Sequence, residues 1–252
     1  MTDHATAPVA TETTAGPLFD RNAARYDLVN TVITFAQDRR WRAWAAGRAL
    51  ALAAAPPPGA RPALLDACAG TGLVGLEAAR LGARVTLADA SPVMLGRARR
   101  RAAARRLEVA TVVTDLAAPP PFAPASFEAV TLAFGLRYLR DPLSSLRAVA
   151  GLLRPGGALV VLESVVPVAA HGRACAVATR AAAWYFFTVA PRVGAAIAGR
   201  DELYERLTAT TASFGGLETL RHLVVEAGLE PLEVRQWAWG LVAGIAARSA
   251  PV

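Results

Sequence analysis

The sequence contains no lysine and little cysteine or histidine. Its 27 basic residues are all arginine, and against 20 acidic residues they give a formal net charge of +7 over 252 residues. Cys68 and Cys175 stand far apart, and neither belongs to a CxxC motif or a cysteine/histidine cluster. This pattern supports neither a disulfide framework nor a zinc site, so we expect no metal.

The sequence also lacks an uninterrupted apolar run of about 20 residues, the length that crosses a bilayer. Mean hydropathy is nevertheless high, at +0.34. The nearest candidate, Ala174–Gly199, is interrupted by Arg180, Pro191 and Arg192, which make a spanning helix costly. Residues 1–17 lack the basic and apolar regions of a signal peptide. We therefore expect a disordered lead over residues 1–17 and a cytoplasmic protein.

The exclusive use of arginine as the basic residue has two explanations. A GC-rich genome favours arginine codons, but arginine also attracts anionic lipid surfaces, phosphates and nucleic acid. The densest cluster, Arg97–Arg106, lies on a predicted helix without interleaved aromatic residues, which favours a solvated helix face over a nucleic-acid site. We expect no nucleic-acid partner, and leave open peripheral contact with the inner face of a membrane and a homodimer.

Hydrophobic patterning predicts a single α/β domain over residues 18–252. Residues 18–55 are predicted to form two helices, residues 171–211 a helical cap rich in aromatic residues, and residues 216–227 a helix. Between the first two segments, short apolar runs alternate with helical ones, which is typical of βαβ units and a parallel sheet. The predicted strands are Ala63–Ala67, Arg84–Ala88, Leu107–Val113, Ala129–Phe134 and Ala158–Leu162, then two near Glu230–Trp237 and Gly240–Ala247.

The strongest local signal is LeuLeuAspAlaCysAlaGlyThrGly at residues 64–72. An apolar strand ends at Asp66, small residues let ligand atoms approach the backbone, and a helix N-terminus near Gly75 presents free N–H groups. The next strand ends at Asp89, roughly 20 residues beyond the loop, where a carboxylate can accept hydrogen bonds from two ribose hydroxyls. Both features are common to NAD and S-adenosylmethionine (SAM) binders.

The acidic residues at the strand ends favour SAM over NAD as the ligand. Asp66 would repel a pyrophosphate but can hold the amino group of a methionine moiety. Asp115, after the third strand, is placed to meet an adenine amino group, with Leu116 offering a backbone N–H. A helix cap or turn explains each acid alone equally well, but three at successive strand ends favour the ligand. The predicted cofactor-binding residues are Asp66, Cys68, Gly70, Thr71, Gly72, Asp89, Ala90, Asp115, Leu116 and Ala133.

Four further motifs are PheAspArgAsnAlaAlaArgTyrAsp at 19–27, AspArgArgTrpArg at 38–42, SerPheGluAlaValThrLeuAlaPheGlyLeuArg at 126–137 and ArgProGlyGlyAlaLeuValValLeuGlu at 154–163. With them, the chain resembles the ubiquinone/menaquinone C-methyltransferase family over nearly all of residues 18–248. The resemblance implies a class I SAM-dependent methyltransferase with a Rossmann-like, mostly parallel seven-stranded sheet and helices on both faces. It also implies an N-terminal helical lid and a helical insertion before the last strands.

Five residues depart from the family's pattern: Leu73, Ala133, Tyr138, Val165 and Gly215. Tyr138 stands where the family has asparagine, and Ala133 and Val165 replace residues with small hydroxyls. We expect most of these changes to lie where the substrate head-group or the cofactor edge would be. Methyl transfer is therefore better supported by the resemblance than a quinone substrate.

The resemblance assigns catalysis to Arg137, which would stabilise an acceptor oxyanion or orient a water molecule. Tyr138 and Tyr26 are the other catalytic candidates. Each has a simpler explanation: a surface ion pair of Arg137 with Asp141, a space-filling Tyr138, and a packed aromatic residue at Tyr26 in the lid. Glu163 ends a strand facing the crevice where such folds bind ligands.

Two further features remain ambiguous from the sequence. His171 titrates in the range of a general base, but a solvated loop histidine explains it better. The aromatic run 184–187, together with Trp44, could wall a tunnel for a prenyl tail, and an ordinary core stripe at helical spacing explains it equally well.

The leading function is C-methylation of a prenylated quinol such as demethylmenaquinol, a lipophilic small molecule. A specialised-metabolite C- or O-methyltransferase acting on an aromatic or isoprenoid acceptor is the alternative, favoured by Tyr138, Ala133 and Val165. A SAM-binding protein without transfer activity, a basic nucleic-acid binder and an NAD-dependent oxidoreductase are less favoured, the last because of the loop acids.

Overall fold

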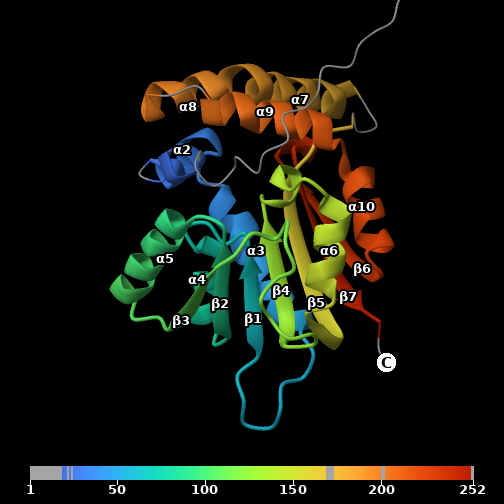
Figure 1. Ribbon diagram of the computed structural model, residues 1–252. Coiled ribbons are helices and arrows are strands. Elements are labelled where there is room, and N and C mark those ends of the chain that lie inside the picture. The colour runs from blue at the N-terminus through green and yellow to red at the C-terminus, as the bar shows by residue number, and fades with distance from the viewer. Residues whose placement is uncertain (1–18, 22, 24, 169–172, 200–201, 251–252) are drawn as a thin grey trace, which may run out of the picture.

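A computed structural model describes residues 19–21, 23, 25–168, 173–199 and 202–250 (Figure 1). The expected disordered lead over residues 1–17 and the loop histidine His171 lie outside these residues.

The core of the fold is a seven-stranded sheet in the order β3-β2-β1-β4-β5-β7-β6. Strands β1 to β5 pair in parallel, and β7 runs antiparallel to both β5 and β6. This confirms the predicted Rossmann-like class I fold with a mostly parallel sheet. The strands are β1 (Ala63–Ala67), β2 (Arg84–Asp89), β3 (Val109–Val113), β4 (Phe127–Ala133), β5 (Leu153–Ser164), β6 (Leu229–Trp237) and β7 (Val242–Ser249).

Helices cover both faces of the sheet. On one face pack α3 (Asp38–Leu52), α4 (Leu73–Arg80) and α5 (Pro92–Ala104), and on the other α6 (Pro142–Ala150) and α10 (Leu217–Glu226) (Figure 1). Each face has its own buried apolar cluster, because the central strands are buried on both sides. Chain order reverses between β1 and β4, and in such sheets ligands bind beyond the carboxyl ends of the strands at that point.

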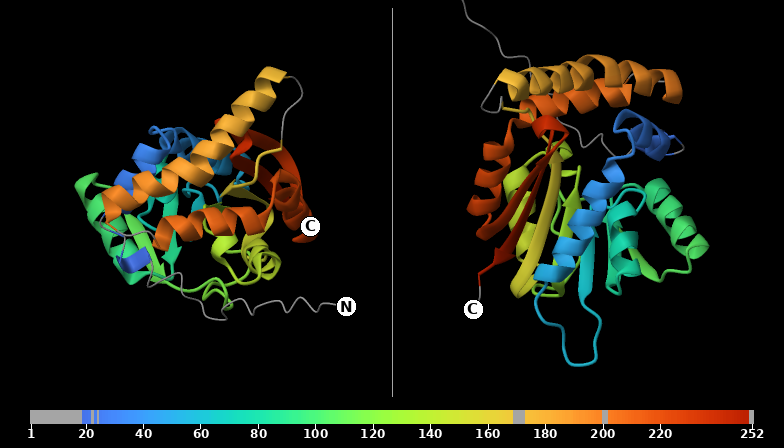
Figure 2. Two further views of the ribbon diagram at one scale, coloured as in Figure 1. Left: turned by 90° about the horizontal axis from the view of Figure 1, so that it is seen from above. Right: turned by 180° about the vertical axis from the view of Figure 1, so that it is seen from behind.

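A second group of helices lies across the carboxyl end of the sheet. It comprises α7 (Arg173–Trp184), the π-helical η2 (Tyr185–Val189), α8 (Ala190–Ala198) and α9 (Glu202–Phe214). Figure 2 shows these helices spanning the top of the sheet, with α2 (Tyr26–Ile33) beneath them. Two short helical turns, η1 (Leu136–Tyr138) and η3 (Ala238–Gly240), lie at the same end.

Local backbone geometry explains where the strands differ from their predicted bounds. Strand β4 ends at Ala133 because Phe134 has a left-handed φ of +60°. Strand β3 begins at Val109 because Arg106, with a φ of +54°, closes the end of α5. Strand β5 is longer than predicted at both ends, since its pairing with β7 reaches Ser164. Strand β7 starts at Val242, after the η3 turn.

The apolar segment of the cap is helical throughout, as predicted, and Arg180, Pro191 and Arg192 interrupt its apolar character without ending the helix. Pro191 lies in the first turn of α8, directly after η2, and a π-helical segment accommodates a missing backbone donor. Within the described residues, Ala174–Ala198 is the single helix long and apolar enough to cross a membrane, with 25 residues and a mean hydropathy of 1.2 in its best window. Only 11% of that window is buried.

Candidate functional site

Asp66 closes the turn that follows β1. Its Oδ2 accepts a hydrogen bond of 2.8 Å from the backbone N–H of Gly75, and its Oδ1 accepts one of 2.8 Å from the Thr131 hydroxyl. Burial raises the pKa of Asp66 to about 6, and these two hydrogen bonds lower it only in part. Glycine is needed at position 75, because an added Cβ would lie 2.3 Å from Leu87 and 3.0 Å from Asp66 Oδ2. Contact of Asp66 with a methionine amino group stays a prediction.

Asp89, at the end of β2, holds the glycine loop. Its Oδ2 accepts a 2.7 Å hydrogen bond from the N–H of Gly70, and its Oδ1 accepts one of 2.8 Å from the N–H of Ser91. Burial raises the pKa of Asp89, and the backbone hydrogen bonds oppose this shift. Gly70 and Gly72 have φ values of +55° and +78°, a region that favours glycine. The loop backbone and the carboxylate assigned to ribose therefore lie together.

The remaining predicted cofactor residues lie at the neighbouring strand ends. Asp115 Oδ1 accepts a 2.9 Å hydrogen bond from the N–H of Ala117, which is the turn geometry considered as its simpler explanation. The adjacent Leu116 is buried. Ala90 is exposed after β2, and Ala133 is half-buried at the end of β4. Their contact with a ligand is a prediction.

Cys68 lies at the centre of a group of acids. Burial, together with the carboxylates of Asp89, Asp66, Glu163 and Asp115, raises the pKa of its thiol well above the usual value. Carboxylates from separate strands therefore converge at the sheet's carboxyl end. Such a set of hydrogen-bond acceptors suits a ligand with cationic groups and hydroxyls, and disfavours a pyrophosphate. These residues fit SAM, whose sulfonium and amino groups are both cationic.

The lid helix α2 is fastened to this loop by charged contacts. The Thr71 hydroxyl donates to Asp27 Oδ1 at 2.8 Å, and Arg101 Nη2 pairs with Asp27 Oδ2 at 2.5 Å. Arg101 Nη1 also donates to the Thr71 carbonyl at 2.9 Å. Three segments distant in sequence, α2, the glycine loop and α5, therefore meet at Asp27. The sequence analysis missed this contact, since it treated Arg97–Arg106 only as a solvated face.

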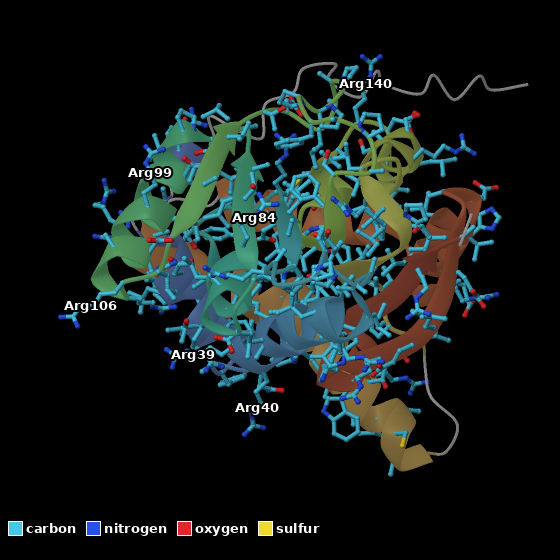
Figure 3. All side chains as sticks on the ribbon, turned by 90° about the horizontal axis from the view of Figure 1, so that it is seen from below. Arg39, Arg40, Arg84, Arg99, Arg106 and Arg140 are labelled. Atoms are coloured by element: carbon cyan, nitrogen blue, oxygen red, sulfur yellow. The ribbon has the colours of Figure 1, made fainter. Side chains whose placement is uncertain are left out.

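Most other arginines of that run are exposed. Figure 3 shows Arg99 on α5, Arg106 just after it, and Arg39, Arg40, Arg84 and Arg140 on other segments, all six spread widely across the view. The labelled arginines therefore do not gather on one face. The expectation that nucleic acid is not a partner stays a prediction.

Arg137 is buried and paired with Glu163, not with Asp141. Its Nη1 contacts Glu163 Oε1, and its backbone N–H donates to Glu163 Oε2 at 3.2 Å. The surface ion pair was thus the wrong alternative, because Asp141 instead caps α6, accepting from the N–H of Ser144 at 2.9 Å. Although burial alone would lower it, the Glu163 carboxylate holds the pKa of Arg137 above its usual value. The Arg137 Nε is buried without a hydrogen-bond partner among the described residues.

Two tyrosines flank the guanidinium. Arg137 Nη2 donates to the Tyr138 hydroxyl at 3.1 Å, and the guanidinium lies 4.4 Å from the Tyr138 ring centre. Burial, with a smaller effect from Tyr138, raises the pKa of Tyr26, whereas Arg42 and Arg137 oppose the rise. Tyr26 therefore stays protonated near neutral pH and can donate a hydrogen bond.

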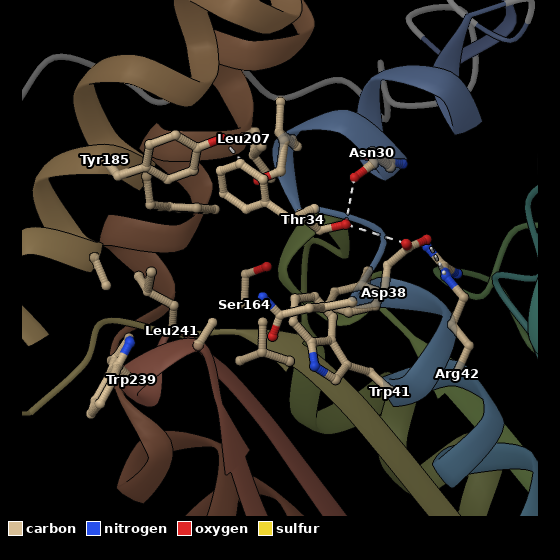
Figure 4. Close-up of a pocket in the computed structure, with 18 of the residues that line it drawn as sticks. Asn30, Thr34, Asp38, Trp41, Arg42, Ser164, Tyr185, Leu207, Trp239 and Leu241 are labelled. Carbon is tan, nitrogen blue, oxygen red and sulfur yellow. Dashed lines mark hydrogen bonds and ion pairs between the residues drawn. The ribbon is translucent and has the colours of Figure 1, made fainter. Parts of the chain in front are cut away.

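A cavity of about 610 Å³ opens beside these residues, between the sheet end, the lid and the cap (Figure 4). Arg137, Tyr138 and Tyr26, the three predicted catalytic residues, all line it. Its other walls are mostly apolar and include Ile33, Trp41, Phe134, Ala178, Tyr185, Phe186, Leu203, Leu207, Leu241 and Val242.

The predicted aromatic tunnel is correct in part. Tyr185 and Phe186 line the cavity. Trp184 points outward, with 63% of its surface exposed. Trp44 lies on the β7 side of the sheet, where its ring contacts Trp237 at a centroid distance of 5.0 Å, so it does not line the cavity. The aromatic residue that α3 does place in the wall is Trp41.

The residues that depart from the family's pattern lie mostly away from the cavity. Only Tyr138 among the five lines it. Val165 is fully buried beneath the sheet end, and Gly215 has a φ of +95°, which a proline cannot adopt. Of the five, only Tyr138 therefore meets the expectation for the substrate head-group, and a position of the others at the cofactor edge stays a prediction.

Comparison with known proteins agrees with this geometry. Residues 8–248 match the sequence profile of the ubiE/COQ5 methyltransferase family. The chain belongs to this family. A demethylmenaquinone methyltransferase from Thermus thermophilus is 38% identical over 214 residues, covering 84% of this chain and 90% of that protein.

Solved structures show the same fold at lower identity. The [4+2]-cyclase SpnF superposes with a TM-score of 0.62 at 20% identity, covering 97% of this chain and 98% of its own. A SAM-dependent methyltransferase from Aquifex aeolicus gives 0.53 at 14% identity, covering 74% of this chain and 81% of its own. Family and fold together identify this protein as a SAM-dependent methyltransferase, with SAM as its co-substrate.

Proposed function

We propose that this methyltransferase transfers a methyl group to a ring carbon of a prenylated hydroquinol such as demethylmenaquinol. The observation that carries the proposal is the cavity: about 610 Å³, apolar over most of its wall, and polar where Arg137, Tyr138 and Tyr26 meet. An amphipathic acceptor with a hydroxylated ring and an apolar tail matches this division. The relative from Thermus thermophilus is named for a demethylmenaquinone substrate.

The predicted cofactor residues do not line this cavity, but they support methyl transfer at the same carboxyl end of the sheet. Asp89 would accept from ribose hydroxyls, Asp66 would meet the amino group, and Asp115 the adenine. Bound SAM supplies an electrophilic methyl group. The protein's part is to orient the acceptor carbon in line with that group and to exclude water.

Arg137 would hold the acceptor oxygen as negative charge develops on it. Its guanidinium is buried, stays charged, and has a buried Nε without a partner among the described residues. Fixed donors in such a site stabilise an oxyanion more than they would in water. Glu163 fixes the orientation of Arg137, and Tyr26 adds a neutral donor.

A second candidate is a specialised-metabolite methyltransferase, favoured by Tyr138. The phenol contacts Arg137 through its hydroxyl and its ring, at the position where the resembled family has asparagine. It therefore changes both the shape and the hydrogen bonding of the polar end of the cavity.

An assay with methyl-labelled SAM distinguishes the two candidate functions. The protein is given reduced demethylmenaquinol, or a panel of soluble phenols and prenyl diphosphates, as the acceptor. We expect label in the extracted demethylmenaquinol product, with kcat/KM rising with tail length. Efficient labelling of a soluble phenol, with none of demethylmenaquinol, would replace the first proposal with the second.

The cavity also supports access from a membrane surface. Phe35 and Trp239 both line it, yet they are 71% and 60% exposed, so they lie at its open edge. Arg180 and Arg192 on the cap helices are also exposed. Exposed aromatic residues and arginine together favour the interface of an anionic bilayer. We therefore propose that the protein associates peripherally with such a surface.

A further inference from the structure

A row of polar side chains crosses the otherwise apolar wall of the cavity. Asn30, Thr34, Asp38 and Arg42 recur at every fourth residue from α2 into α3, and all four line the cavity. The Thr34 hydroxyl lies 2.6 Å from the backbone carbonyl oxygen of Asn30 and 3.2 Å from Asp38 Oδ1. Arg42 Nε lies 3.5 Å from Asp38 Oδ2 (Figure 4). We call this set the polar row.

Asp38 is the member whose burial needs an explanation. It is 3% exposed, and a buried carboxylate is costly unless partners satisfy it. Its described side-chain partners are Thr34, whose single hydroxyl proton is shared with Asn30, and Arg42 at 3.5 Å. A carboxylate has about four acceptor positions. Asp38 therefore retains acceptor capacity that faces the cavity.

Asp38 is also the one acid among the described residues that line the cavity. The charged and titratable groups facing it there are Arg42 from its own helix, Tyr26 from α2, Arg137 and Tyr138 from η1, and Tyr185 from the cap. The arginines are cationic donors, and the raised pKa values of Tyr26 and Tyr185 keep both phenols protonated near neutral pH. No histidine is among the described lining residues.

Tyr26 connects Asp38 with the predicted oxyanion site. Arg42, the ion-pair partner of Asp38, and Arg137 both act electrostatically on Tyr26. The polar row and the Arg137 cluster therefore border the same end of the cavity. An acceptor hydroxyl held there can meet a cationic donor on one side and a carboxylate on the other.

We propose that Asp38 is the general base that takes the hydroxyl proton of the methyl acceptor, an inference that rests on the proposed function. The O–H bond breaks, its proton goes to the Asp38 carboxylate, and the oxygen electron pair raises the electron density on the adjacent ring carbon. That carbon then bonds to the methyl carbon as the S–CH3 bond breaks and S-adenosylhomocysteine leaves. Loss of the ring C–H proton to water restores the aromatic ring as a phenolate, and the proton held by Asp38 returns to the phenolate oxygen, so that one proton is released overall.

The experiment compares acceptors of graded acidity. Native protein and Asp38→Asn are assayed with 2-prenyl-1,4-naphthohydroquinones that carry increasingly electron-withdrawing ring substituents, kept reduced with dithionite. We expect Asp38→Asn to lose about 100-fold or more in kcat on the least acidic acceptor, the range of general-base catalysis. The loss should shrink along the series, and raising the pH should restore the variant as the acceptor ionises in bulk solution.

Controls separate a catalytic role from a structural one. Asp38→Glu keeps the carboxylate and should retain part of the activity, and Arg40→Ala, on the exposed side of the same helix, should match the native protein. The SAM dissociation constant, measured by calorimetry without acceptor, should be unchanged in all three variants. A loss that is equal for every acceptor and insensitive to pH overturns the inference. Failure of native protein to methylate any acceptor overturns the proposed function instead.

Discussion

At the scale of single residues, the buried carboxylate of Asp66 lowers the free energy of unfolding at neutral pH. Its carboxyl is 1% exposed, and burial raises its pKa to about 6, above the value of 3.8 for the free side chain. Because the folded-state pKa is the higher one, the stability contributed by the protonated form is fully present below about pH 4. It is lost as the pH rises through about 6.

Asp66→Asn should therefore stabilise the protein at neutral pH and not at pH 4. The amide can still accept from the N–H of Gly75 and removes the buried charge. We expect the free energy of unfolding at pH 7.5 to rise by at most about 3 kcal/mol, the equivalent of about two pKa units. Urea denaturation at both pH values measures this, and SAM affinity should fall in the same variant. A variant that is destabilised equally at both pH values would contradict the account.

Tyr138 is the residue to change when acceptor choice is tested. Tyr138→Asn removes the ring stacked on Arg137 while keeping a hydrogen-bonding side chain. We expect the ratio of kcat/KM values for demethylmenaquinol and a small phenol to change by about 10-fold, or about 1.4 kcal/mol. The SAM dissociation constant should stay constant. An unchanged ratio would show that Tyr138 does not contact the acceptor.

At the scale of elements, α2 closes over the glycine loop through Asp27. Its partners Thr71 and Arg101 come from the loop and from α5, so loop position and lid position are coupled. A hydrogen bond to a charged group contributes about 1.5–3 kcal/mol. The described contacts are half-buried, and solvent reduces this value.

Arg101→Gln should loosen this lid. We expect faster hydrogen–deuterium exchange over residues 26–33 and a SAM dissociation rate raised by about 10-fold, equivalent to about 1.4 kcal/mol. Arg100→Gln, an exposed neighbour on the same helix, is the matched control. Equal exchange in the two variants would show that the ion pair does not hold the lid.

The regular elements were predictable from the sequence, and their irregular ends were not. Apolar runs such as those of β1 and β2 indicate buried parallel strands directly. The left-handed φ of Phe134 has no sequence signal, because residues other than glycine rarely adopt it. The ion-pair partner of Arg137 could not be predicted from the local sequence either. Arg137 pairs with Glu163, 26 positions away, and not with the nearby Asp141. The sheet topology, and not local sequence, brings these two residues together.

At the scale of the whole molecule, the cavity opens between three separate parts of the chain: the lid, the sheet end and the cap. The cofactor-binding role of the acids was predicted from their positions at strand ends, and their contact with SAM stays a prediction. The sequence motifs did not predict that the residues of the polar row line one cavity. That arrangement depends on how α2 and α3 pack under the cap.

Membrane association should depend on the open edge of the cavity. Phe35→Ser and Trp239→Ser remove exposed aromatic rings at this edge. We expect both to reduce flotation with anionic liposomes and to lower kcat/KM for long-tailed acceptors only, and salt to release the native protein as charge is screened. Leu81→Ser, an exposed residue that follows α4 shortly before β2 begins, is the control. Release of native protein by detergent alone would indicate an inserted anchor instead.

The position of the transferred methyl group tests the central claim most directly. Native protein is incubated with reduced demethylmenaquinol and SAM labelled with carbon-13 in its methyl group, and the product is examined by NMR. The account predicts a ring-bound methyl signal that couples to ring carbons. A methoxy signal, or no transfer to demethylmenaquinol by protein that binds SAM, would contradict it.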